Sequence, residues 1–91
     1  MRLKVELHPD VAWVIRHRCN AHERSSFYER LEQVRSDPIE LSEPTFDPQL
    51  GRYMLRFFRF EGHLAIFQLD IGNDRIRVTE CHRQGKGSGR R

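Results

Sequence analysis

The chain has 91 residues, of which 37% are hydrophobic and 32% charged, enough for one domain with one modest core. It has no run of about 18–20 apolar residues and no apolar block near its start, which predicts neither a membrane span nor a secretion signal. Cys19 and Cys81 are too few for a disulfide scaffold; we expect reduced thiols in a cytoplasmic protein, with one bridge as the alternative.

The net charge of +3 is distributed unevenly along the chain. Residues 1–51 carry seven Lys and Arg against nine Asp and Glu, whereas residues 52–91 carry nine against four. Such a basic half attracts phosphate groups, for which arginine supplies paired donors. It indicates either a solvated basic surface or a surface for an anionic partner, which is nucleic acid or an acidic protein segment.

The first part of the chain predicts a strand and two helices. Apolar residues alternate with charged ones over residues 3–7, as in a half-buried strand, and Pro9 then begins a helix. A second helix follows, and capping-box motifs that begin at Asn20 and at Ser26 leave two possible starts. Pro38 ends this helix, so that the two helices form a hairpin with one shared apolar side.

After a loop-like stretch from Pro38 to Gly51, apolar residues recur with a period of two. Residues 52–60, 63–70 and 75–81 predict three antiparallel strands, and a turn at Glu61-Gly62 makes the numbers of facing residues sum to 123. We expect the helices to cover one face of this sheet, formed by Leu55, Phe57, Leu64, Ile66, Ile76 and Val78. The opposite, open face is expected to collect Arg56, Phe58, Phe60, His63, Ala65 and Phe67.

The predicted fold is therefore α+β: an N-terminal strand, a two-helix hairpin and a three-stranded antiparallel meander, with the helices on one sheet face. It occupies residues 1–83 as a single domain, and residues 84–91 are expected to form a flexible basic tail. The sequence contains no phosphate-binding glycine-rich loop and no cysteine spacing typical of zinc, so we expect no cofactor and no metal ion.

Histidine, arginine and phenylalanine on the meander suit RNA cleavage without a metal ion. That reaction needs a base for the 2′-hydroxyl, an acid for the leaving oxygen and cations for the charged phosphorane. Histidine supplies the proton steps, arginine the charge, and aromatic rings hold unstacked bases. Each residue also has an ordinary alternative. It is a surface position for His63, an ion pair with an acidic side chain such as Glu61 for Arg56, and a second small core or a partner interface for Phe58 and Phe67.

The order of these elements resembles the RelE/ParE toxin superfamily of bacterial toxin–antitoxin systems. The resemblance is carried by the Asp37-Pro38 stop and by the segments LGRYMLRFFRFEGHLAIFQLD and RIRVTECHR. It implies a ribosome-dependent mRNA endoribonuclease that cleaves by 2′-hydroxyl attack on the adjacent phosphate. Alternatives within the resemblance are a ParE-like inhibitor of DNA gyrase and a catalytically inactive binding module.

The resemblance also implies roles for individual residues. Arg56 and Arg83 are expected to stabilise the phosphate, while His63 and His82 compete for the proton-transfer roles, and Glu43 is an alternative base. Nucleic-acid contacts are expected from Arg52, Phe58, Phe67, Arg77 and Lys86. The terminal tyrosine of several RelE-like enzymes has no counterpart here, since no tyrosine follows Tyr53.

The expected partners follow from the same resemblance. They are mRNA on the ribosome and a cognate antitoxin, whose acidic segment wraps the toxin and neutralises its basic surface.

Overall fold

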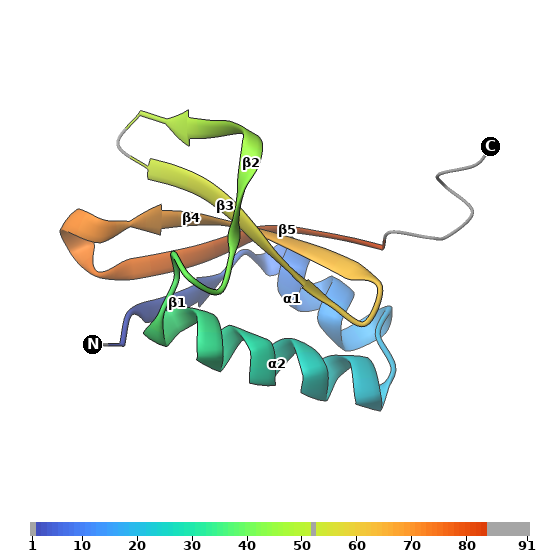
Figure 1. Cartoon of the computed structure of the whole chain (residues 1–91). Coiled ribbons are helices and arrows are strands. Elements are labelled where there is room, and N and C mark those ends of the chain that lie inside the picture. Colours follow the sequence, from blue (N-terminus) through green and yellow to red (C-terminus); the bar gives the residue numbers. More distant parts are fainter. Residues whose placement is uncertain (1, 52, 84–91) are drawn as a thin grey trace.

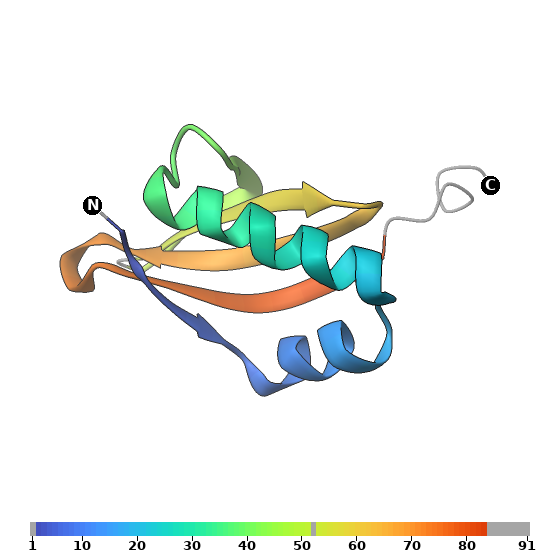
Figure 2. The ribbon, with the colours of Figure 1, turned by 90° about the horizontal axis from the view of Figure 1, so that it is seen from below.

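The computed structural model describes residues 2–51 and 53–83, with the exception of the side chains of residues 46–50. Its elements follow in the order β1 (Lys4–Leu7), α1 (Pro9–His17), α2 (Ala21–Ser36), β2 (Glu43–Leu50), β3 (Tyr53–Phe60), β4 (His63–Asp70), the single-turn helix η1 (Ile71–Asn73) and β5 (Arg75–Arg83). The strands form one sheet in the order β1-β5-β4-β3-β2, in which β1 runs parallel to β5 and all other neighbours are antiparallel. Both helices lie against the same face of this sheet (Figures 1 and 2).

Two local caps fix the helices. The Nδ1 of His8 accepts a hydrogen bond from the backbone N–H of Asp10 at 3.0 Å, and Pro9 occupies the first turn of α1. At α2, Asn20 and Glu23 form a reciprocal capping box, with both hydrogen bonds at 2.8 Å. Of the two predicted starts, the one at Asn20 is therefore confirmed. None of the helices in the described part of the chain is long and apolar enough to cross a membrane.

The stretch from Pro38 to Gly51 contains a strand, so its prediction as a loop is wrong. β2 pairs with β3 at both of its ends, with an irregularity between Pro44 and Gln49. A proline donates no backbone hydrogen bond, and such residues are tolerated in an edge strand or at a bulge. Pro44 and Pro48 therefore made this segment resemble a loop in the sequence, although it is a strand at the edge of the sheet.

The predicted register of the meander is confirmed. Phe60 faces His63 and Phe57 faces Ile66, so that facing numbers sum to 123. Glu61 and Gly62 both have positive φ, of 45° and 79°, as a two-residue hairpin turn with the right twist requires. β5 continues to Arg83, two residues further than predicted.

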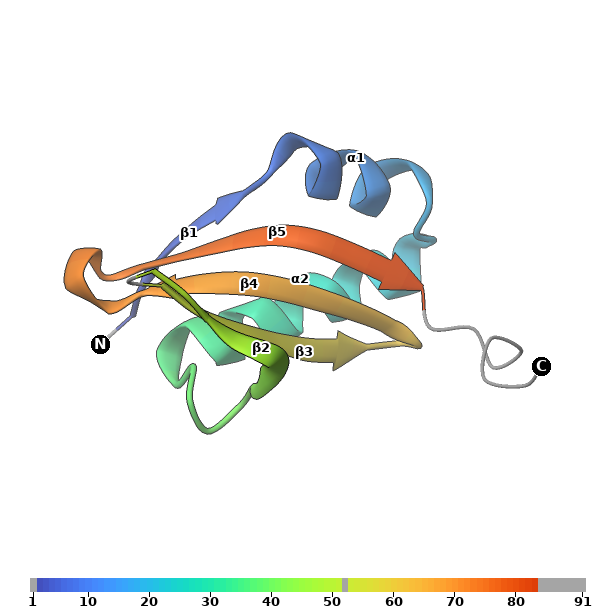
Figure 3. The ribbon, with the colours of Figure 1, turned by 90° about the horizontal axis from the view of Figure 1, so that it is seen from above.

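The prediction of which face the helices cover is wrong for β3 and β4, although Ile76 and Val78 of β5 do lie on the covered face as predicted. The inner face, which packs against the helices, carries Phe58, Phe60, His63, Ala65, Phe67, Leu69, Ile76 and Val78, all buried. Leu55, Phe57, Leu64 and Ile66 lie on the other face, which we call the outer face and over which neither helix passes (Figure 3). β5 has a β-bulge at Thr79. Ile66 of β4 faces Glu80 and the next residue, Phe67, faces Val78, so Thr79 is an extra residue in β5.

The core explains this choice of face. Phe27 of α2 is fully buried, and its ring centre lies 5.1 Å from that of Phe60 and 6.0 Å from that of Phe58. Aromatic side chains bury the most apolar area, so burying the three inner phenylalanines under the helices is worth more than burying the outer face, which has one phenylalanine on β3 and β4. The predicted residues of the basic tail, 84–91, lie outside the described part of the chain.

Candidate functional site

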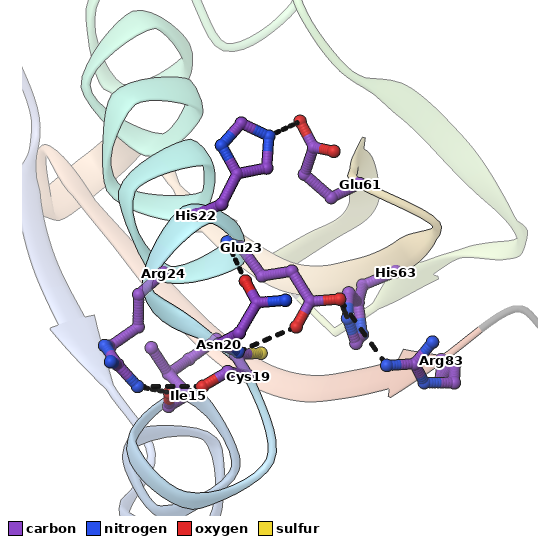
Figure 4. Close-up of polar contacts among 9 residues, drawn as sticks. All are labelled: Ile15, Cys19, Asn20, His22, Glu23, Arg24, Glu61, His63 and Arg83. Atoms are coloured by element: carbon purple, nitrogen blue, oxygen red, sulfur yellow. Dashed lines mark hydrogen bonds and ion pairs between the residues drawn. The ribbon is translucent and has the colours of Figure 1, made fainter.

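One end of the sheet meets the junction between the two helices. There the register aligns Phe60 of β3, His63 of β4 and Arg83 of β5 in one row across the strands. The side chains of His63 and Arg83 both reach Glu23 in the first turn of α2 (Figure 4). Together with Cys19, these residues form what we call the Glu23 cluster: Cys19, Glu23, His63 and Arg83.

Glu23 is the centre of this cluster. One of its oxygens accepts the backbone N–H of Asn20, and the other lies 3.2 Å from His63 Nε2 and 3.5 Å from an Arg83 guanidinium nitrogen. The hydrogen bond from Asn20 is the main reason that the pKa of Glu23 lies below its ordinary value, and His63 adds to the effect. The carboxylate is therefore held as an anion in a site where its side chain is only 13% exposed.

His63 is buried, which contradicts its predicted place on an open face. Its side chain is 3% exposed, and its ring stacks on Phe60 with centres 4.9 Å apart. Nδ1 has no hydrogen-bond partner among the described residues, and an unpaired buried polar atom costs about 1–3 kcal/mol. The imidazole therefore belongs to the inner face and is closed off from the outer face.

Cys19 lies in the turn between the helices and is buried beside Glu23. Burial, followed by the charge of Glu23, raises the pKa of its thiol. The guanidinium of Arg24 donates to three carbonyls at the end of α1, the shortest bond being 2.8 Å to the Cys19 oxygen, and so fixes this turn. Cys19 and Cys81 are both free, as predicted, and burial raises the pKa of Cys81 to about 11.

Arg56 also differs from its predicted position on the open face. It is only 9% exposed, and its guanidinium donates to the Ser42 hydroxyl at 2.6 Å and to the carbonyls of Ser42 and Ile39 at 2.8 and 3.1 Å. It thus ties the connection between α2 and β2 to the sheet. Glu61, the alternative partner predicted for Arg56, instead pairs with His22 at 3.2 Å.

The phenylalanines predicted to stack on bases are core residues. Phe58 is 2% exposed and Phe67 is fully buried, so neither offers a ring face to a nucleotide. The alternative of a second small core is also wrong, because both rings belong to the main core that the helices cover. Two further predicted contacts, Arg52 and Lys86, lie outside the described residues.

The outer face presents a different set of polar residues. Arg59, Leu64 and His82 face one another across β3, β4 and β5, and we call them the outer row. The side chains of Arg59 and His82 are 55% and 59% exposed. Arg59 pairs with Glu43 at 2.9 Å and lies over the Phe57 ring, while His82 contacts Glu80 at 2.7 Å. Arg77, further along β5, pairs with Glu6.

Arg59 was not singled out from the sequence, although the signal was present. The turn at Glu61-Gly62 already placed Arg59 opposite Leu64. If the helices had been predicted on the correct face of the sheet, Arg59 would have been predicted on the exposed face, in one row with His82. Glu23 was likewise visible only as a capping residue, since nothing in the sequence places it near His63.

An open cleft of about 530 Å³ lies beside the Glu23 cluster. Its lining residues are Trp13, Val14, Arg18, His63 and Arg83. Trp13 is 50% exposed and Arg18 lies over its ring at 5.3 Å, so the cleft combines an aromatic surface with cations. The cleft borders the Glu23 cluster at His63 and Arg83.

The chain matches no protein-family model and no curated protein by sequence. Its structure is similar to that of an archaeal RelE–RelB complex from Pyrococcus horikoshii OT3, with a TM-score of 0.81 and 14% identity over 94% of this chain and 99% of that chain. It is also similar to a free E. coli RelE toxin carrying two arginine-to-alanine substitutions, with a TM-score of 0.64 and 13% identity over 97% and 90% of the two chains. The chain therefore has a RelE-like fold, as its sequence resemblance predicts.

Proposed function

We propose that this chain is the toxin of a toxin–antitoxin pair and acts as a ribosome-dependent mRNA endoribonuclease. The observation that carries this proposal is the RelE-like fold, which extends over 94% of the chain in the comparison with the archaeal RelE–RelB complex. Support comes from the outer row, which places an exposed arginine and an exposed histidine on the sheet face that no described helix covers.

The geometry of the outer row suits one phosphate between two side chains. Neighbouring strands are about 4.8 Å apart, so the Cα atoms of Arg59 and His82 are separated by roughly 10 Å, with Leu64 between them. Both side chains are long enough to lean toward a group bound above Leu64. Arg59 then neutralises the phosphate, and Glu80 holds the His82 ring in place.

The chemistry follows from these positions. The Glu43 carboxylate, beside Arg59, accepts the proton of the 2′-hydroxyl as its oxygen attacks phosphorus. The bond from phosphorus to the 5′-oxygen breaks, and His82 gives that oxygen a proton. The products are a 2′,3′-cyclic phosphate and a 5′-hydroxyl. Arg83 lies outside the outer row with its side chain toward Glu23, and because this side chain is 62% exposed at the end of β5, it is available to a phosphate that passes this end of the sheet.

This assignment revises the roles expected from the sequence. His82 takes a proton-transfer role because it is exposed, whereas His63 is buried. Arg59 replaces Arg56 as the phosphate ligand, because the Arg56 guanidinium is bound to Ser42 and Ile39. Both buried residues support the sheet rather than touch RNA.

The same proposal includes a partner and a compartment. By analogy with the archaeal RelE solved in complex with RelB, the partner is an antitoxin. Its acidic segment is expected to cover the outer row and to neutralise Arg59, His82 and the nearby Arg83. Action on translating ribosomes places the protein in the cytoplasm, where the free thiols Cys19 and Cys81 stay reduced.

The test is cleavage of a short mRNA on programmed ribosomes. Wild type should cut at the A-site codon, and Arg59→Ala and His82→Asn should each lower the rate by about 10²–10³-fold. The matched control is Arg16→Ala, which removes an exposed arginine from α1, on the other side of the molecule. Message that stays intact with wild type contradicts the proposal, and DNA supercoiling by gyrase is then the activity to measure.

A further inference from the structure

The Glu23 cluster contains the donor atoms of a metal site, although the sequence showed no metal-site spacing. Cys19 Sγ, one Glu23 oxygen and one His63 ring nitrogen all lie within 4.8 Å of one another. They come from the turn after α1, the first turn of α2 and the start of β4. We propose that these three side chains bind one divalent ion of the zinc class, separately from the outer row.

The spacing of the donors fits tetrahedral coordination. Zinc binds nitrogen and oxygen at about 2.0–2.2 Å, so two such ligands lie roughly 3.3 Å apart on a tetrahedral ion. His63 Nε2 and the nearer Glu23 oxygen are 3.2 Å apart. The sulfur lies no more than 4.8 Å from the other donor atoms, so it has to approach by at most about 1 Å to bind at the longer zinc–sulfur distance of about 2.3 Å.

The chemical types of the donors select the ion. A thiolate and an imidazole favour zinc and its neighbours among the transition metals, whereas magnesium and calcium require oxygen ligands. Binding releases one proton, from the Cys19 thiol, and the imidazole proton moves from Nε2 to Nδ1. One thiolate and one carboxylate then balance the two positive charges of the ion, and water takes the fourth position.

The surroundings hold the donors in place, and a cleft borders them at His63 and Arg83. The capping box fixes the Glu23 carboxylate, and Arg24 fixes the Cys19 backbone. Within the described residues, the His63 side chain is hydrogen-bonded to Glu23, and its Nδ1 is buried and unpaired. Arg83 makes a long contact of 3.5 Å to Glu23 and is 62% exposed, so it can turn into the cleft as the ion enters.

The experiment uses the purified full chain, stripped of metal and kept reduced, titrated with Co²⁺ and then with Zn²⁺. We expect one ion per chain, the visible absorption of tetrahedral cobalt, a sulfur-to-cobalt charge-transfer band, and loss of both on adding zinc. Zinc should also raise the melting temperature, because the ion binds the folded state.

Matched cysteine variants locate the site. Cys19→Ser should lose the charge-transfer band and weaken binding by at least about tenfold, since even groups outside the ligand shell contribute that much. Cys81→Ser, the control, should behave as wild type. Glu23→Gln and His63→Asn should lose the tetrahedral spectrum.

Melting curves establish that each variant is folded before its spectrum is compared. Absence of a sulfur band in folded wild type, or its persistence in Cys19→Ser, would overturn the proposal. Binding without that band, through the exposed histidines, would overturn it as well. None of these readouts depends on RNA cleavage, so the metal site and the proposed nuclease can fail independently.

Discussion

Arg56 and Arg59 lie three residues apart on β3, yet the two faces of the sheet give them opposite properties. Arg56 points to the inner face, is 9% exposed and makes three hydrogen bonds to the connection between α2 and β2. Arg59 points to the outer face, is 55% exposed and makes one ion pair at the surface. Successive side chains of a strand point to opposite faces of the sheet. On β3, this alternation determines which arginine holds the fold together and which stays available to a ligand.

The largest expected difference between the two faces is in stability, and replacing one phenylalanine on each face tests it. Phe67→Ala should lower the free energy of unfolding by about 3–5 kcal/mol, because the ring is fully buried against the core. Phe57→Ala, the same change on the partly exposed outer face, should cost roughly half as much. Urea denaturation of both variants measures the difference, and equal losses would mean that the two faces are equally buried.

The two arginines should give the next largest effect. Replacing Arg56 is expected to lower stability more, and replacing Arg59 is expected to lower activity more. Arg56→Ala leaves the carbonyls of Ile39 and Ser42 without their donor and should cost about 2–3 kcal/mol. Arg59→Ala removes a surface ion pair and should cost less than about 1 kcal/mol. Urea denaturation gives the stabilities.

The ribosome assay, run below the melting temperature of each variant, then completes the comparison. Arg56→Ala should cleave nearly as wild type does, and Arg59→Ala should not. An inactive but well-folded Arg56→Ala would restore the role that the sequence resemblance gave to this residue.

The inversion of the faces also shows the limit of sequence reasoning. The period of two and the turn at Glu61-Gly62 determine which residues face one another, and that register is confirmed. Both faces of β3 and β4 carry apolar residues, however, so periodicity alone does not say which face the helices cover. Contact of Phe27 with Phe58 and Phe60 decides it, and that contact depends on how α2 crosses the sheet.

The candidate sites were predictable to different degrees. His82 and Arg83 were singled out from the sequence. Arg59 would have been added if the face of the sheet that the helices cover had been predicted correctly. The Glu23 cluster was out of reach, because Glu23 and His63 are 40 residues apart and meet only when α2 packs on β4. Likewise β5 continues past its predicted end, and the extra residue at Thr79 changes which of its side chains point inward.

The cap of α2, a helix that covers the inner face of the sheet, offers a smaller test. Asn20→Ala removes the side chain that accepts the Glu23 N–H and should cost about 1 kcal/mol. Ser26→Ala, at the second start that the sequence allowed, lies inside α2 and should change stability by no more than a few tenths of a kcal/mol. Thermal or urea unfolding compares the two, and a larger loss for Ser26→Ala would contradict the observed start of the helix.

The smallest effect concerns an exposed carboxylate of β1 beside the outer face. Hydrogen bonds from Arg77, and then from Arg75, hold the pKa of Glu6 below its ordinary value of 4.5. The folded state therefore binds fewer protons there than the unfolded chain, so the contribution of Glu6 is present above pH 4.5 and is lost as the pH falls through the lowered pKa. Urea unfolding between pH 6 and about pH 3 should show a shallower decline for Glu6→Gln than for wild type. Arg77→Ala should reproduce part of that change, since the hydrogen bond from Arg77 is the largest single cause of the lowered pKa. An unchanged profile in Glu6→Gln would mean that solvent screens this surface network completely, whereas the buried hydrogen bonds of Arg56 remain unscreened.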